Sequence, residues 1–139
     1  MATRRKEREL ALQLAYAMDM TREGFEEARY KYTQSDPRRR AAWGEFAERL
    51  ASCARQHEAE IDERLKGALK NWRIERLSAV DRCVLRLAAC ELLFFPEVPA
   101  RVTIDEYVEA ARQYGADESA SFVNGVLDAL ARSCPGKRL

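Results

Sequence analysis

The first turns of a predicted N-terminal helix gather positive charge in a way that suits binding to phosphate. Arg4, Arg5, Lys6 and Arg8 lie where positive charge opposes the helix dipole, at a cost of roughly 0.3–1 kcal/mol each at exposed sites. A guanidinium group can hold a phosphate through two hydrogen bonds and can stack on a nucleobase. The motif therefore predicts a nucleic-acid contact. Taken alone, a solvated helix end explains these charges equally well.

Tyr16 extends the same side of that helix. Successive residues of an α-helix are about 100° apart, so Arg5, Leu12 and Tyr16 share a face that lies roughly opposite the apolar stripe. The stripe, which is expected to face the core, consists of Leu10, Leu14, Ala17 and Met18. An exposed tyrosine among arginines adds a stacking surface for a base.

The remaining reactive side chains do not support an enzyme. The chain has a single histidine, His57, and its glycines form no phosphate-binding motif. Cys53, Cys83, Cys90 and Cys134 lack the short spacings of a zinc site. Acidic residues alternate with arginines on helix faces, where solvated ion pairs are usual. We therefore expect no catalytic residue, metal or cofactor, and interpret His57 as a core or interface residue.

Length and composition predict one globular domain in the cytoplasm. A chain of 139 residues with 47% hydrophobic and 34% charged residues can bury a single core. The net charge of +1 means that any RNA binding must come from a local basic patch. Unpaired thiols indicate a reducing compartment. The N-terminus lacks the continuous apolar segment of a signal peptide or a membrane span.

Apolar residues that recur every three or four positions predict an all-helical fold of about seven helices. In the first half of the chain the helices are expected at about 3–20, 25–32 and 43–69. Asp36 and Pro37 give a helix start signal before the last of these. That segment is either one long helix or two nearly continuous ones, with a break near 57–60.

Local signals also delimit the helices of the second half. Residues 78–81 and 103–106 each resemble a capping box that opens a helix. Pro96 ends the first of these helices and Gly115 ends the second. A last helix begins near 117–119. Short connections favour antiparallel neighbours, so two packed helical bundles are expected.

A soft boundary near Trp72 divides the single domain, 1–139, into an arginine-bearing half, about 1–72, and a more apolar half, about 73–135. We expect Trp72 to cover the core between the two halves. Phe122 lies at the edge of the apolar stripe of the last helix, on the side of Glu118. Its pattern slightly favours burial, and the alternative is an exposed anchor for a partner.

Three blocks of sequence, in order along the chain, resemble the NusB family. They comprise 4–19, then 71–72 with 76–92, and finally 99–109, 114–116 and 122–128. Each block is modest evidence, whereas the ordered set is specific. Only about 21–61 carries no mark of the family. Lys6 stands where the family frequently has arginine, which keeps the charge but loses two-pronged hydrogen bonding.

The resemblance implies a seven-helix fold of two bundles and a role in transcription antitermination, especially on ribosomal RNA operons. It implies a heterodimer with NusE, the small-subunit ribosomal protein, that binds boxA-type single-stranded RNA within an elongation complex containing other Nus factors. Arg4, Arg5, Lys6 and Arg8 are then RNA-binding residues. Tyr16, Asp81, Glu118 and Phe122 lie on the NusE-facing surface or its border with RNA, which favours exposure of Phe122.

Two alternatives remain at this stage. The nearer is an RNA-binding module related to the N-terminal domain of certain ribosomal-RNA cytosine methyltransferases. Those chains continue into a catalytic domain, whereas this one ends at Leu139, which favours a free-standing factor. The other is a helical adaptor that binds only proteins. The sequence leaves open whether the free protein is a monomer or a homodimer that hides its RNA surface.

Overall fold

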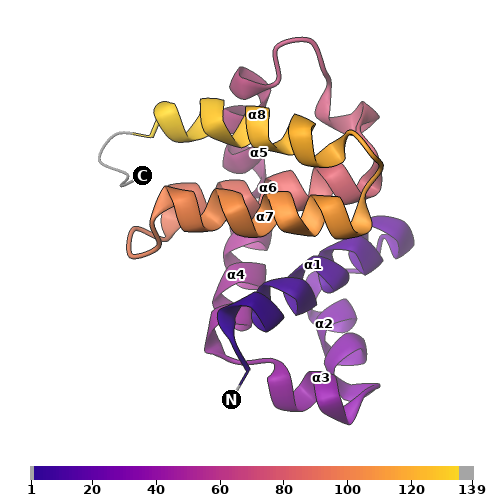
Figure 1. Ribbon diagram of the computed structural model, residues 1–139. Helices are drawn as coiled ribbons and strands as arrows, with labels where there is room; N and C mark the ends of the chain where they lie inside the picture. The colour runs from indigo at the N-terminus through magenta and orange to yellow at the C-terminus, as the bar shows by residue number, and fades with distance from the viewer. Residues whose placement is uncertain (1, 135–139) are drawn as a thin grey trace.

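The computed structural model describes residues 2–134, and the described residues form eight α-helices, one short 3-10 helix and no strand (Figure 1). The helices are α1 (Arg4–Thr21), α2 (Phe25–Gln34), α3 (Pro37–Ala42), α4 (Glu45–Gln56), α5 (Glu58–Ala68), η1 (Ile74–Arg76), α6 (Ala79–Phe94), α7 (Ala100–Tyr114) and α8 (Ser119–Arg132). The all-helical expectation is confirmed, with eight α-helices in this part of the chain instead of about seven. Residue 135, the expected end of the second half, lies outside the described residues.

Helix α6 occupies the centre of the molecule. It packs against α1 and α4 on one side and against α5, α7 and α8 on the other, and α1 to α4 form the lower part of the molecule in Figure 1. Small residues along α6, including Ala88, Ala89 and Cys90, are fully buried and let these neighbours approach closely. Helix α5 thus packs with the C-terminal helices, although it lies in the first half of the sequence.

The segment expected as one or two long helices contains a further break at Trp43–Gly44. Asp36 caps α3 with its side chain and Pro37 occupies the first turn, as the start signal predicted. Trp43 is extended, and Gly44 then caps α4. The second break falls at His57, within the predicted window, where the half-buried imidazole stacks on Phe94 at 4.2 Å between ring centroids.

Glu7 of α1 fixes the start of α4. Its carboxylate is buried and accepts a hydrogen bond of 2.9 Å from the backbone N–H of Ala47 in the first turn of α4. A Cβ atom at residue 44 would lie only 2.6 Å from Oε1 of Glu7, so a larger residue there would have to displace this carboxylate. Glu7 therefore caps a helix that begins almost forty residues later in the chain.

Replacing Glu7 by alanine is expected to lower the free energy of unfolding by about 1–2 kcal/mol, the usual cost of losing a helix cap. Urea denaturation measures this loss. Glu9→Ala is the matched control, because Glu9 pairs with Lys6 at the surface and such pairs contribute about 1 kcal/mol or less. Equal destabilisation by the two variants would contradict the capping role.

The capping signals of the second half give one confirmation and one correction. Oγ of Ser78 accepts the N–H of Asp81 at 3.1 Å and opens α6, as predicted. The prediction that α7 opens at 103–106 is wrong, because α7 begins at Ala100, directly after Pro99. Proline fixes φ and lacks an N–H that the helix start would leave unpaired, so it suits this position. Thr103 lies inside α7 and is buried.

The four cysteines are free thiols, and Cys83 and Cys90 are buried as expected. Burial raises the pKa of Cys83 to about 11, so this thiol is protonated at neutral pH. Within residues 2–134, no helix has the length and apolar character needed to cross a membrane.

Candidate nucleic-acid and partner interface

Arg4, Arg5 and Lys6 project from the first turn of α1 and are all exposed. Each is held by a neighbouring group. The guanidinium of Arg4 lies 4.7 Å from the ring centroid of Phe46, that of Arg5 binds Glu106, and Nζ of Lys6 donates to Glu9 at 3.2 Å. The three cations therefore form an ordered basic surface, which we call the basic tier.

Arg8 lies in different surroundings from the basic tier. Its side chain is only 7% exposed and donates two hydrogen bonds of 2.9 Å to the carboxylate of Glu91, which is completely buried. Tyr107 and Thr103 of α7 donate their hydroxyls to the same carboxylate, at 2.7 and 3.3 Å. The expectation that Arg8 is exposed beside the other three is therefore wrong. This face of α1 is covered by α6 and α7.

The electrostatics of this buried cluster keep Arg8 charged. Burial acts to lower the pKa of Arg8, but the hydrogen bonds and negative charge of Glu91 outweigh it, and the pKa is raised. Burial and then the charge of Glu91 raise the pKa of Tyr107, so its hydroxyl stays protonated and donates. The cluster joins α1, α6 and α7 and is structural, because it is closed to solvent.

Tyr16 is 41% exposed, as expected, whereas Leu12 is buried at 5% exposure. Leu12 lies in a shallow groove of about 60 Å³ between α1 and α7, which Arg5, Glu106 and Tyr114 also line. Leu12 lies outside the main apolar stripe but is nevertheless buried, because α1 has apolar contacts beyond that stripe. Tyr114 is 39% exposed, so the groove that Arg5 lines also offers an aromatic side chain.

Phe122 of α8 is half-buried and packs edge-to-face against Trp72, with ring centroids 5.7 Å apart. Trp72 is 58% exposed and lies in the loop before η1. The expectation that Trp72 covers the core is wrong, and its role in an exposed aromatic pair was missed. The sequence feature that could have indicated this exposure is the position of Trp72 at the end of an apolar run, where no further turn of that helix follows to cover the ring.

Acidic groups lie on the elements beside this aromatic pair. Glu118 is exposed directly before α8, and Asp81 is half-buried in the first turn of α6. Oδ1 of Asp81 is buried without a hydrogen-bond partner. Asp19 near the end of α1 binds Arg82 through two hydrogen bonds of 2.7 and 3.3 Å, which joins the helix of Tyr16 to the first turn of α6.

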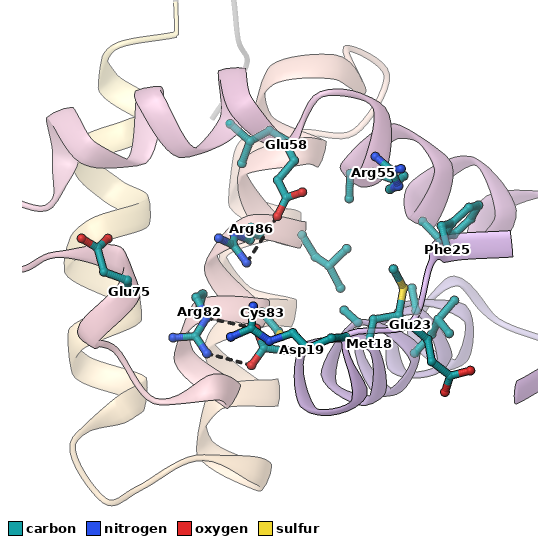
Figure 2. A pocket seen from close by; sticks show the side chains of 18 residues that line it. Met18, Asp19, Glu23, Phe25, Arg55, Glu58, Glu75, Arg82, Cys83 and Arg86 are labelled. Carbon is teal, nitrogen blue, oxygen red and sulfur yellow. Dashed lines mark hydrogen bonds and ion pairs between the residues drawn. The ribbon is translucent and has the colours of Figure 1, made fainter. Parts of the chain in front are cut away.

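A hollow of about 430 Å³ lies between α1, α2, α4, α5 and α6 (Figure 2). Met18, Phe25 and Cys83 contribute to its lining, and ion pairs cross its wall between Asp19 and Arg82 and between Arg86 and Glu58. These charges satisfy one another, and the one thiol in it is protonated. Among residues 2–134, no group of three or more potential metal ligands is present.

Comparison with known proteins identifies similar chains over the whole length. Residues 5–132 match the NusB family. Transcription antitermination protein NusB of Geobacter sulfurreducens is 41% identical over 138 residues, covering 99% of both chains. That of Koribacter versatilis is 38% identical over 136 residues, covering 98% of this chain and 93% of the relative.

Solved structures of the same family are also similar. NusB of T. maritima superposes with a TM-score of 0.84 at 36% identity, covering 97% of this chain and 96% of that one. A structure of antitermination factors NusB and NusE in complex with dsRNA gives a TM-score of 0.81 at 27% identity, covering 94% and 96%.

Proposed function

This chain belongs to the NusB family, and we propose that it binds boxA-type single-stranded RNA as a heterodimer with NusE. It is a transcription antitermination factor and not an enzyme. In the proposed mechanism it is a scaffold in the cytoplasm. One surface holds nascent RNA, another holds NusE, and the assembly joins other Nus factors on the polymerase that transcribes ribosomal RNA.

The basic tier is the observation that carries the RNA proposal. Arg4, Arg5 and Lys6 are exposed together, and each is ordered by a contact within the protein, so little freedom is lost when a phosphate binds. Tyr114 in the adjoining groove offers a stacking surface for an unpaired base. Arg8 supports the tier from the core and is not proposed to touch RNA.

The proposed partner surface consists of Tyr16, Asp81, Glu118 and Phe122, to which the structure adds Trp72. Exposed aromatic rings beside charged groups are typical anchors of protein interfaces. Asp81 and Glu118 favour a partner with a basic surface. In support, the structure of antitermination factors NusB and NusE in complex with dsRNA contains a chain that has the fold of this one.

The double variant Arg4→Ala, Arg5→Ala is expected to weaken RNA binding by about a hundredfold or more, as hydrogen bonds to two charged groups are lost at about 1.5–3 kcal/mol each. Fluorescence anisotropy with a boxA-type oligonucleotide and NusE, repeated over a range of KCl concentrations, measures the effect. The slope of log affinity against log salt concentration should fall by about 1.4, at about 0.7 per phosphate contact on single strands.

The matched control is Arg38→Ala, Arg40→Ala, which removes two exposed arginines from α3. This variant should bind RNA as the wild type does and keep its salt dependence. Equal weakening by both pairs would indicate bulk electrostatics instead of a site at the basic tier. If the wild type binds NusE but never RNA, the chain is a protein adaptor.

A further inference from the structure

Glu106 of α7 holds Arg5 by one edge of its guanidinium group. Nε of Arg5 donates to Oε1 at 3.0 Å and Nη2 donates to Oε2 at 2.8 Å. The side chain of Arg5 is nevertheless 72% exposed, whereas that of Glu106 is 18% exposed. The mostly buried carboxylate of Glu106 therefore holds one edge of Arg5, whose side chain otherwise faces solvent.

This grip leaves the other edge of the Arg5 guanidinium available. A guanidinium has five N–H groups, and Glu106 takes one from Nε and one from Nη2. Both N–H groups of Nη1 and the second of Nη2 remain, and one from each nitrogen lies on the outer edge, which Glu106 does not occupy. Two parallel N–H groups on one edge match the oxygens of a phosphate.

The carboxylate of Glu106 is itself anchored to the core. Its Oε1 lies 4.0 Å from Nη1 of Arg8, and Arg8 is fixed by the buried carboxylate of Glu91. The hydrogen bonds and charge of Arg5 lower the pKa of Glu106, so it is ionised at neutral pH. A row of alternating charges therefore runs from the buried Glu91 through Arg8 and Glu106 to Arg5 at the surface.

We propose that Glu106 is a positioning residue of the RNA site, which holds Arg5 by its Nε edge so that its outer edge meets an RNA phosphate. The inference rests on the proposed function. An unrestrained arginine must give up its rotational freedom when it binds, and the grip of Glu106 removes most of that loss beforehand. RNA does not have to displace Glu106, because the two groups use different edges.

Glu106→Gln separates this role from simple electrostatics. Removing a negative charge beside a polyanion strengthens binding if charge alone matters. Positioning predicts the opposite, a weakening by about three- to tenfold, the worth of a single net hydrogen bond. The matched control on the same helix is Glu109→Gln, which removes an exposed carboxylate whose charge also acts on Arg5 but which hydrogen-bonds Arg112. This control should bind as tightly as the wild type or more tightly.

Arg5→Lys and Arg5→Ala complete the test. Lysine keeps the charge but has no second edge, so Glu106→Gln should cause no further loss in either background. Affinity is measured with the same boxA-type oligonucleotide in the presence of NusE. Thermal unfolding and NusE binding of each variant should match the wild type, which a purely structural role for Glu106 would not allow.

The outcomes distinguish the inference from the function on which it rests. Weakening by Glu106→Gln that depends on Arg5 supports positioning. If Arg5→Ala weakens binding but Glu106→Gln leaves it unchanged or tighter, Glu106 is a bystander or a competitor of RNA, and only this inference is overturned. A wild type that binds no RNA overturns the proposed function and this inference together.

Discussion

Arg8→Ala is expected to lower the free energy of unfolding by about 3–5 kcal/mol, because it leaves the buried carboxylate of Glu91 without its ionic partner. Glu91 has no exposure to water and the hydroxyls of Tyr107 and Thr103 cannot replace a full positive charge. The loss is a large fraction of the total stability of a small domain, which is about 5–15 kcal/mol. Urea denaturation followed by circular dichroism measures it.

Arg112→Ala provides the control for the loss of an arginine. Its side chain is 61% exposed and pairs with Glu109 on the surface of α7, where an ion pair contributes about 1 kcal/mol or less. A second test replaces both buried charges, Arg8→Met with Glu91→Leu, and should recover much of the lost stability, since a buried pair can often be exchanged for apolar groups. If Arg8→Ala costs no more than Arg112→Ala, the buried pair does not stabilise the fold.

The place of Arg8 shows which information the sequence lacks. Four cations in the first turns of a helix indicate a basic surface, and for Arg4, Arg5 and Lys6 the exposure is as expected. Arg8 is buried instead of exposed, and it binds Glu91, which lies 83 residues away in sequence. A single buried glutamate within the apolar run of α6 carries no local sign of its partner. Long-range pairing of this kind depends on how the helices pack, so a local pattern does not predict it.

Most helix ends with a local signal were predicted, although the capping box at 103–106 does not mark the start of α7. A helix begins or ends as expected at Asp36 with Pro37, at Ser78 and at Gly115. Each of these signals acts within one turn of its own helix. The break at Gly44 was missed because its reason is the carboxylate of Glu7 on another helix. The same holds for the proposed partner surface. The apolar pattern of the sequence predicts where Phe122 lies on α8. The pattern does not predict its contact with Trp72, because Trp72 lies in a loop.

Trp72→Ala and Phe122→Ala are each expected to weaken binding of NusE by about 2 kcal/mol or more, the usual threshold for an interface anchor. Trp72 exposes more than half of its surface, and its ring is held in place against Phe122. A large aromatic side chain that is already ordered contributes buried area at a small entropic cost. Isothermal titration calorimetry of each variant with NusE measures the loss.

The two rings should also act together, because each holds the other in place. Removing both should therefore cost less than the sum of the single losses, with a coupling of about 0.5–1.5 kcal/mol for an aromatic pair in contact. Tyr30→Ala is the control, since Tyr30 is 65% exposed on α2 and belongs to neither proposed surface. RNA binding by the chain alone should be unchanged in all of these variants. Unchanged NusE affinity in both single variants would place the partner elsewhere and leave the proposed RNA site at α1 unaffected, because the aromatic pair lies on α8 and on the loop before η1.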